Sequence, residues 1–265
     1  MDKNSISCED FGKYVFHYTS LKNCVEILDT HHIRLSPLER TNDPYEWTNW
    51  PLDWVDRYLP KDTKAIEERH LSIQQTWSQI RKRFQVFGGY CESKANEGPK
   101  QDGRTQIPMW AHYGDNHEGV CLVIDRKRFT ENLRVLFPSS FSKSVRYGGI
   151  SGADYLKAHD LPESLLNVQD HKTLVRKHAR EHIDQLFYTK SRAWQGESEW
   201  RWVVDHWRED YIHVPIDHSL IEVVLGQKVR DFYYPAMREA VRANRAHLFR
   251  ATWDPLLGGI ECNPL

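Results

Sequence analysis

The stretch EWRWVVDHWREDYIHVPIDHSLIEVVLG, residues 199–226, decides the fold that we expect for this chain. It contains three runs of β-branched and aromatic residues, EWRWVVD, YIHVPI and LIEVVLG, with polar residues between them. Runs of this composition and length predict strands. Strands that follow one another closely along a chain usually pair in antiparallel fashion. We therefore predict a largely antiparallel, twisted sheet.

Strands and helices are interleaved irregularly in the rest of the chain. Further strands are expected at YVFHYT (14–19), FQVFGGYCES (84–93), GVCLVID (119–125) and, as the last strand, AHLFRATWD (246–254). Helical patterns cover about 62–82 and 162–188. The GxGxxG pattern of doubly wound nucleotide-binding folds is absent. These features predict an α+β fold and a single domain spanning 1–265, with helical insertions at about 51–83 and 160–188.

Charge and cysteine content indicate the broad class of protein. The net charge of the 265 residues is −1, so the chain as a whole is not drawn to nucleic acid or to membranes. The five cysteines are dispersed, which favours reduced thiols in a cytoplasmic protein. No apolar run reaches the length of about 18 residues that a membrane span requires. We expect no association with membranes.

The sequence GESEWRWVV, residues 196–204, places two carboxylates at the start of the first C-terminal strand. Side chains alternate along a strand, so Glu197 and Glu199 are expected to project from the same face. Carboxylates at the entry of a buried strand cost free energy unless another group pairs with them. Arg201 belongs to the same expected face and is a candidate for keeping both carboxylates ionised.

Two further groups of residues occupy notable positions. His17 and Tyr18 lie in the first expected strand, and Trp110 and Tyr113 lie in a short helix expected to begin near Pro108. Each residue alone is explained by ordinary packing. Together with the glutamates, they suit cleavage of an N-glycosidic bond to a cationic nicotinamide. A carboxylate stabilises the oxocarbenium-like sugar, an aromatic ring stacks on nicotinamide, and a histidine hydrogen-bonds the ribose.

The segment HYGDNHEG, residues 112–119, offers a different site. His112, Asp115, His117 and Glu118 are residue types that bind metals, and their density can supply two or three ligands. The same residue types are common at a turn between a helix and a strand. A metal-dependent hydrolase built on these four residues is therefore an alternative function.

The segment TNDPYE, residues 41–46, is expected to be part of an irregular loop because prolines interrupt it. Asn42 and Asp43 before Pro44 favour a turn, and a ligand contact is equally compatible with them. Arg40 and Glu46 are candidates for substrate contacts or for a salt bridge.

Four motifs, read in order, carry a resemblance to a known family. HYT (17–19), NDPYE (42–46), MWAHYG (109–114) and ESEWR (197–201) resemble motifs of an uncharacterised bacterial domain of unknown function. The resemblance extends from His17 to about Gly226. That family in turn resembles the ADP-ribosyltransferase superfamily of the His-Tyr-Glu type. The resemblance implies one ADP-ribosyltransferase-like domain, a split β-sandwich of mainly antiparallel strands around bound NAD⁺.

The resemblance also implies which residues bind the cofactor. His17 matches the first-strand histidine that binds the NAD ribose, and Tyr18 and Thr19 follow it in the same motif. Tyr113 matches the aromatic residue that stacks on nicotinamide. In the superfamily that residue closely follows a strand, whereas MWAHYG comes after a long polar loop, so Trp110 stays open as the alternative.

The catalytic residues implied by the resemblance come from the ESEWR motif. Glu199 matches the catalytic glutamate, and Glu197 matches the glutamate that orients or deprotonates the acceptor in some members. Arg201 is grouped with the cofactor-binding residues. The implied enzyme consumes NAD⁺ as a co-substrate and needs no metal.

The partners implied are a macromolecular acceptor and an antitoxin protein, because bacterial members are often toxins of toxin–antitoxin or anti-phage systems. RNA is slightly preferred over protein or DNA, as in other bacterial toxins of the superfamily. Two basic runs are candidate RNA contacts, one at 81–83 and the other formed by Arg238, Arg242 and Arg245. A non-catalytic module that binds a nucleotide is a further alternative.

Overall fold

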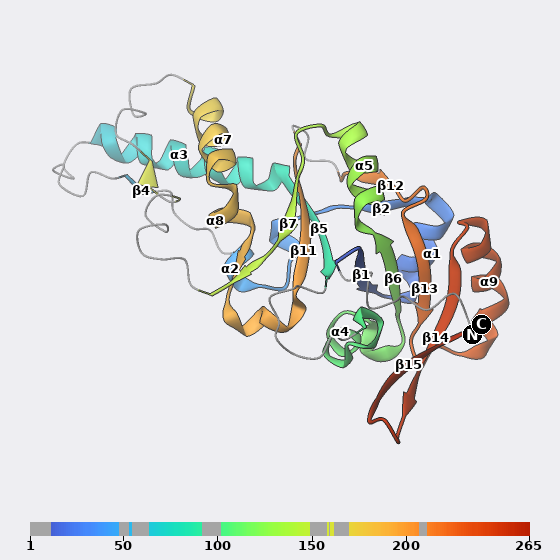
Figure 1. The fold of residues 1–265 in the computed structure, drawn as a ribbon. Helices are drawn as coiled ribbons and strands as arrows, with labels where there is room; N and C mark the ends of the chain where they lie inside the picture. The colour runs from blue at the N-terminus through green and yellow to red at the C-terminus, as the bar shows by residue number, and fades with distance from the viewer. Residues whose placement is uncertain are drawn as a thin grey trace.

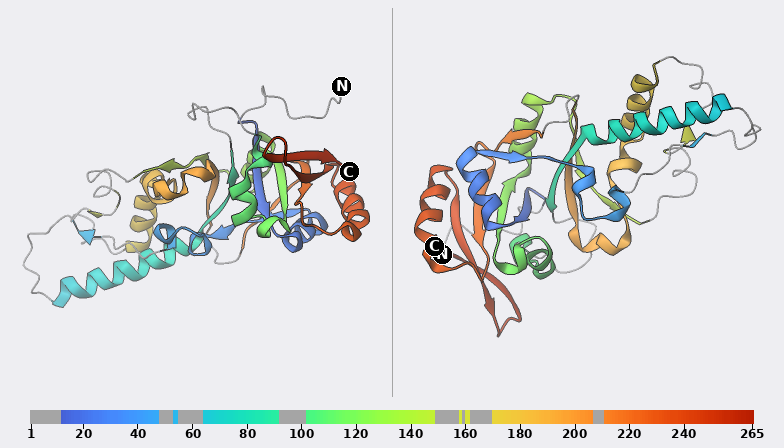
Figure 2. Two further views of the ribbon diagram at one scale, coloured as in Figure 1. Left: turned by 90° about the horizontal axis from the view of Figure 1, so that it is seen from below. Right: turned by 180° about the vertical axis from the view of Figure 1, so that it is seen from behind.

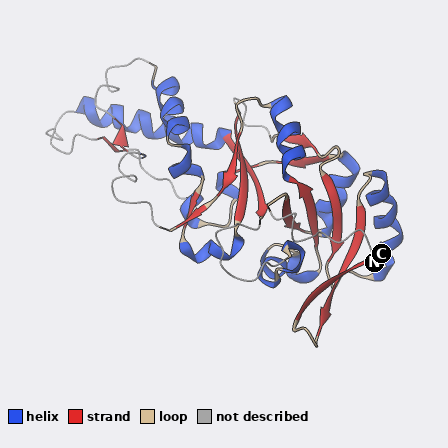
Figure 3. Cartoon of the chain, viewed as in Figure 1, coloured by secondary structure: helices blue, strands red, loops and turns tan. Residues whose placement is uncertain are grey.

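The centre of the molecule is a mostly antiparallel sheet with helices around it, seen in a computed structural model (Figures 1 and 3). The structure describes residues 12–47, 53–54, 64–91, 102–148, 158, 160–161, 170–206 and 211–265. Within these residues the chain has the mixed α+β architecture that the sequence predicts.

Nine strands of the described chain form the main sheet. In spatial order they are β15 (Gly259–Pro264), β14 (His247–Asp254), β13 (Leu220–Leu225), β6 (Val120–Asp125), β1 (Tyr14–Thr19), β5 (Phe84–Tyr90), β11 (Glu199–Asp205) and β7 (Phe141–Ser144), while β3 (Ser36–Pro37) also pairs with β5. Only β13 and β14 pair in parallel within this sheet. Parallel neighbours need a crossover connection, and helix α9 (Tyr234–Ala243) provides it.

The sheet is weakly joined between β1 and β5. These strands pair at one position, Phe16 with Tyr90, whereas β1 pairs with β6 along its whole length. Farther along β5, the edge that β1 has left is taken by β3, which pairs at Gln85 and Val86. Strands β1 and β5 therefore diverge, and the segment around β3 fills part of the space between them.

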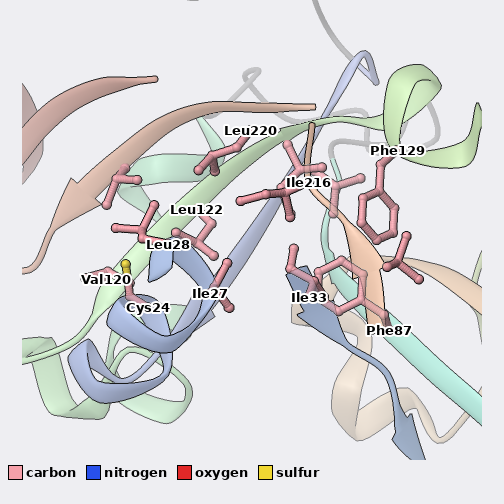
Figure 4. Close-up of a cluster of buried hydrophobic side chains, with 14 of the residues drawn as sticks. Cys24, Ile27, Leu28, Ile33, Phe87, Val120, Leu122, Phe129, Ile216 and Leu220 are labelled. Carbon is pink, nitrogen blue, oxygen red and sulfur yellow. The ribbon is translucent and has the colours of Figure 1, made fainter. Parts of the chain in front are cut away.

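Alternation along β1 assigns its side chains to two different cores. Val15 belongs to a core that helices α1 (Leu21–Thr30), α5 (Arg126–Leu136) and α9 cover. Figure 4 shows part of this core, including Leu28 of α1 and Phe129 of α5. Phe16 and Tyr18 point to the opposite face, where they pack with α4 (Ile107–His112) and the C-terminal strands. His17 lies two residues after Val15 and so shares the face of Val15.

A third core lies at the β11 end of the sheet. Helices α3 (Lys64–Arg83), α7 (His171–Glu181) and α8 (Ile183–Phe187) pack there, far from α1 and α9 (Figures 1 and 2). These helices fall in the two expected insertions. In the described part of the insertion expected at 160–188, residues 171–187 form two helices and not one, because the backbone at His182 is not helical. Parts of both insertions lie outside the described residues.

Short elements complete the described chain. They are β2 (His32–Arg34) paired with β12 (His213–Pro215), β4 (Asp53–Trp54) paired with β9 (Asp160–Leu161), β8 (Arg146–Tyr147) paired with β10 (Thr189–Lys190), α2 (Pro44–Trp47), and the 3-10 turns η2 (Leu38–Arg40), η3 (Gly103–Thr105), η4 (Asp115–His117), η6 (Arg192–Glu197) and η7 (Asp231–Tyr233).

Three details of the sequence-based fold are wrong. The run YIHVPI forms β12, which leaves the main sheet to pair with β2. Strand β15 follows β14 and was not expected, because an exposed edge strand such as GIECNP lacks a clear hydrophobic alternation. The loop TNDPYE contains helix α2, since a proline at the first helical position leaves the later hydrogen bonds intact.

Candidate active site

A pocket of about 450 Å³ lies where β1 and β5 diverge. Its wall combines the end of β1, the first turns of α1, β2, η2, β5, the end of α4 and the start of β11. Of the residues that the sequence singles out, the wall includes His17, Tyr18, Thr19, Arg40, Asn42, His112, Tyr113, Glu197, Glu199 and Arg201. The pocket between the two strands is thus lined by residues from distant segments of the chain.

Arg201 anchors this part of the site. Only 1% of its side chain is exposed. Its Nε and Nη2 atoms donate to the two carboxylate oxygens of Glu199 at 2.7 and 2.8 Å. Its Nη1 atom donates to the carboxylate of Glu46 and, at 2.8 Å, to the carbonyl of Phe187. A bidentate pair of this kind fixes the orientation of the Glu199 carboxylate.

A second cation, Lys190, lies near three carboxylates, those of Glu46, Glu197 and Glu199. Its Nζ atom lies 2.7 Å from Glu197 Oε2, 2.8 Å from Glu199 Oε2 and 3.9 Å from Glu46 Oε2. The expectation that Arg201 pairs with Glu197 is wrong, because Lys190 is the cation that contacts it. Three carboxylates and two cations form one cluster with a formal charge of −1, which favours a cationic ligand group.

Glu197 and Glu199 both contact Lys190, but they do not lie on one strand as expected. Strand β11 begins at Glu199, and Glu197 is the last residue of η6. Ser198 between them has a left-handed backbone, with φ 40° and ψ 48°. Its Oγ atom donates to the carbonyl of Cys91 at 2.9 Å, and its own carbonyl accepts from the Cys91 amide. The turn at Ser198, and not strand alternation, sets the position of Glu197.

The charge state of Glu199 follows from opposing effects. Burial raises its pKa, but the attraction of Arg201 and Lys190 outweighs burial and lowers the pKa well below its ordinary value. Burial lowers the pKa of Lys190, and the attraction of Glu199 and Glu46 outweighs that effect, so its pKa is raised. Both groups are therefore charged at neutral pH.

We expect Glu199 to make the fold sensitive to acid. Because its folded pKa is depressed, its stabilising effect is fully present above the ordinary value of 4.5 and is lost as the pH falls below that value. Wild type should therefore lose more free energy of unfolding than Glu199→Gln between about pH 6 and about pH 3. Urea denaturation at both pH values measures this, and equal losses in the two proteins would refute the assignment.

Tyr113 and Trp110 occupy different environments. The Tyr113 hydroxyl donates to a carboxylate oxygen of Glu197. Burial and the neighbouring Glu197 raise the pKa of Tyr113, so its hydroxyl stays protonated. Trp110 is fully buried, donates from Nε1 to the carbonyl of Arg104 at 2.8 Å, and packs edge-on against Tyr18. Tyr113 thus lies in the pocket wall, and Trp110 lies in the core behind it.

The three residues of the HYT motif contribute differently. The Nδ1 atom of His17 lies 2.8 Å from the carbonyl of Gly88 and must donate to it, which leaves Nε2 as an acceptor. Burial lowers the pKa of His17, so the ring is neutral. The Tyr18 hydroxyl donates to the carbonyl of Gly103, so its side chain belongs to the core. Thr19 accepts from Asn23 at 3.0 Å.

The residues of the alternative metal site do not come together. His112, Asp115 and Glu118 are exposed, and Asp115 and His117 have left-handed backbones with φ values of 50° and 71°. In the described ranges no three His, Cys, Asp or Glu side chains are placed to hold a metal ion. These four polar residues form the turn between α4 and β6.

In one of the two expected basic runs, 81–83, only Lys82 is exposed. Arg81 and Arg83 are buried and donate to the carbonyls of Glu46 and His206, at 2.5 and 3.0 Å. Arg238 and Arg242 of α9 are exposed, as is Arg245 just after it. This second run therefore presents three exposed arginines to a partner such as RNA, whereas the first presents one lysine.

The described chain is a mixed α+β protein. Charged residues from distant segments line one of its pockets. A family model described as "Protein of unknown function (DUF2971)" matches residues 109–202. That range contains Tyr113, Lys190, Glu197, Glu199 and Arg201, whereas His17 and Glu46 precede it. The chain matches no curated protein and no solved structure.

Two other features concern the whole chain. Among the described helices, none is both long enough and apolar enough to cross a bilayer. Cys24, Cys121 and Cys262 are free thiols, and Cys8 lies outside the described residues.

Proposed function

We propose that this chain is an ADP-ribosyltransferase that uses NAD⁺ as a co-substrate and passes ADP-ribose to a macromolecule. The supporting observation is that His17, Tyr113 and Glu199, which come from distant segments, lie in the wall of one pocket. They are the residues that the resemblance assigns to the His-Tyr-Glu site. The negative charge of the neighbouring cluster suits the cationic nicotinamide end of NAD⁺.

Glu199 stabilises the transition state in this proposal. NAD⁺ supplies a glycosidic bond whose electron pair leaves with nicotinamide, so positive charge develops on the ribose. The ionised carboxylate of Glu199 stabilises that charge and accepts from a ribose hydroxyl. Arg201 holds the carboxylate through its rigid fork, while Lys190 has a flexible stem and can yield its place to the ribose.

His17 and Tyr113 hold the ligand. The Nε2 atom of His17 accepts from a ribose hydroxyl, because Nδ1 is engaged with Gly88 and burial keeps the ring neutral. The ring of Tyr113 stacks on nicotinamide, since its hydroxyl is anchored to Glu197 at the edge of the pocket.

Glu197 orients the acceptor. Tyr113 and Lys190 each donate to one of its carboxylate oxygens, so the carboxylate is fixed in direction. As a nucleophilic oxygen or nitrogen of the acceptor bonds to the ribose carbon, its proton passes to Glu197. This division of labour leaves Glu199 to the ribose and Glu197 to the acceptor.

The sheet supports a split β-sandwich as the finer fold class. The five neighbouring strands β15, β14, β13, β6 and β1 pair extensively with one another, and so do the three strands β5, β11 and β7. One paired position, between β1 and β5, joins the two groups. The pocket lies at that junction, which is where a split sandwich binds NAD⁺ in the superfamily.

Gly88 is expected to be essential for this geometry. A Cβ atom at Gly88 would lie 2.9 Å from the Trp200 carbonyl oxygen and closer still to a carboxylate oxygen of Glu199. Gly88→Ala should displace that carboxylate and reduce NAD⁺ turnover about 100-fold, since small misplacements of catalytic groups have effects of this size. Gly196→Ala is the matched control, because nothing lies within 4 Å of its added carbon. Equal turnover in both variants would contradict the proposed role of Glu199.

The acceptor and setting follow from the resemblance and remain part of the proposal. RNA is the preferred acceptor, and the exposed arginines at the end of α9 are available to contact it. The expected setting is a bacterial toxin that an antitoxin protein neutralises, or one that acts in anti-phage defence.

Labelled NAD⁺ tests both the reaction and the acceptor. The purified protein is incubated with cell extract and NAD⁺ labelled in its adenylate phosphate, and the products are digested with nuclease or protease. We expect label in macromolecules that nuclease releases. Release by protease alone would make protein the acceptor. If no macromolecule is labelled and no nicotinamide is released, the proposed function is wrong.

A further inference from the structure

The pocket has a basic side that the proposed catalytic residues do not use. His32 and Arg34 of β2, His213 of β12 and Arg40 of η2 all line it. His213 pairs with Arg34 across the two strands, so their side chains are neighbours on one face. Ile33 and Val214 between them are fully buried in the core, which directs the basic side chains to the pocket.

The two arginines are held in place by one aromatic ring. The guanidinium carbon of Arg34 lies 4.6 Å from the centre of the Tyr211 ring, and that of Arg40 lies 5.0 Å from it. Stacking on a ring face restrains a guanidinium group without occupying its N–H donors. The arrangement therefore presents two oriented sets of donors to the same pocket.

These arginines lack the carboxylate partners that the other pocket cations have. Arg201 and Lys190 each contact carboxylates, whereas no ion pair of the described residues includes Arg34 or Arg40. Glu26 of α1 also lines the pocket, and no ion pair between residues that the structure describes includes it. The guanidinium donors of Arg34 and Arg40 are available to an anionic ligand.

We propose that Arg34 and Arg40 form a binding site for the diphosphate group of a nucleotide. A guanidinium fork matches the geometry of phosphate oxygens, and two forks suit two adjacent phosphates. The pocket then has a cationic side for the diphosphate and an anionic side, at Glu197 and Glu199, for a cationic group. The inference rests in part on the proposed function, since NAD⁺ combines both groups, but binding requires no reaction.

Calorimetric titration of the full chain with ADP and with adenosine tests the site. We expect wild type to bind ADP at least tenfold more tightly than adenosine, and Arg34→Ala with Arg40→Ala to remove most of this difference. The double lysine variant should bind ADP with intermediate affinity, because lysine keeps the charge and loses the fork. Arg134→Ala, an exposed arginine on α5, is the matched control and should bind as wild type does. Thermal unfolding checks that all variants are folded.

The outcomes separate this inference from the proposed function. If the double alanine variant binds ADP as tightly as wild type, the site is wrong. If Glu199→Gln still binds ADP and the double variant does not, the phosphate site stands even where no NAD⁺ is cleaved. A short single-stranded RNA, titrated in parallel, should be insensitive to the two substitutions. A loss of RNA binding with unchanged ADP binding would overturn the proposal.

Discussion

Glu199→Gln is expected to lower the rate of NAD⁺ cleavage about 100- to 1,000-fold. Glutamine keeps the size of the side chain and removes the negative charge that opposes the developing charge on the ribose. Burial raises the pKa of Glu199, but the attraction of Arg201 and Lys190 outweighs burial and lowers the pKa. Wild-type Glu199 therefore carries its charge throughout the neutral range, and the substitution removes that charge. Nicotinamide release, followed by chromatography, measures the rate.

Two controls make this result interpretable. Arg201 retains Glu46 as a partner in the Glu199→Gln variant, so the variant is expected to fold, and thermal unfolding checks this. Glu197→Gln should reduce transfer to the acceptor more than it reduces nicotinamide release, because Glu197 is assigned to the acceptor. Unchanged cleavage in folded Glu199→Gln would contradict the catalytic role of Glu199, and no cleavage by wild type would leave the chain as a nucleotide-binding module at most.

Arg201→Met is expected to lower the free energy of unfolding by about 3–5 kcal/mol. The substitution removes the guanidinium that pairs with both Glu46 and Glu199, and it leaves the Phe187 carbonyl without that donor. Only 2% of the Glu46 side chain is exposed, so its carboxylate cannot recover its hydration. Chemical denaturation measures the loss.

A second substitution distinguishes the ion pair from simple packing. Adding Glu46→Gln to Arg201→Met should recover part of the lost stability, since one uncompensated buried charge is then removed. Arg134→Met, at an exposed position of α5, is the control and should change stability little. A loss below about 1 kcal/mol for Arg201→Met would mean that the cluster is not the buried network described here.

The sequence predicts the sheet well where hydrophobic patterning is local. The runs at β1, β5, β6, β11 and β13 are strands, and the pairs that they form with one another are antiparallel. Succession along the chain does not predict these pairs, because β11 pairs with β5 and β13 pairs with β6. The pairing of Arg201 with Glu199 also follows from alternation along β11. Strand β15 was missed because edge strands carry a weak pattern, and β12 was assigned to the wrong sheet because pairing partners are not encoded locally.

The site was harder to predict where it depends on contacts between distant segments. Glu46 lies 155 residues from Arg201 in the sequence, and only the chain path places them together. Lys190 follows an apolar run with no pattern that signals a buried ion pair. Glu197 was assigned to a strand because the left-handed position in this turn is occupied by Ser198 and not by glycine, the residue type that usually indicates such a turn.

Alternation of side chains along β1 predicts where the aromatic side chain of Tyr18 lies. Val15 and His17 share one face of β1, so Tyr18 had to point to the other face, where Trp110 packs against it. Consistent use of that rule places the Tyr18 side chain in the core. The position of Tyr113 depends on the turn that follows α4, which sequence patterns do not determine.

A crystal structure of the protein with a non-cleavable NAD⁺ analogue tests the central claim most directly. We predict the nicotinamide ring against Tyr113, and ribose hydroxyls within hydrogen-bonding distance of His17 Nε2 and of the Glu199 carboxylate. An analogue bound outside the pocket between β1 and β5, or bound there with its ribose away from Glu199, would contradict the account.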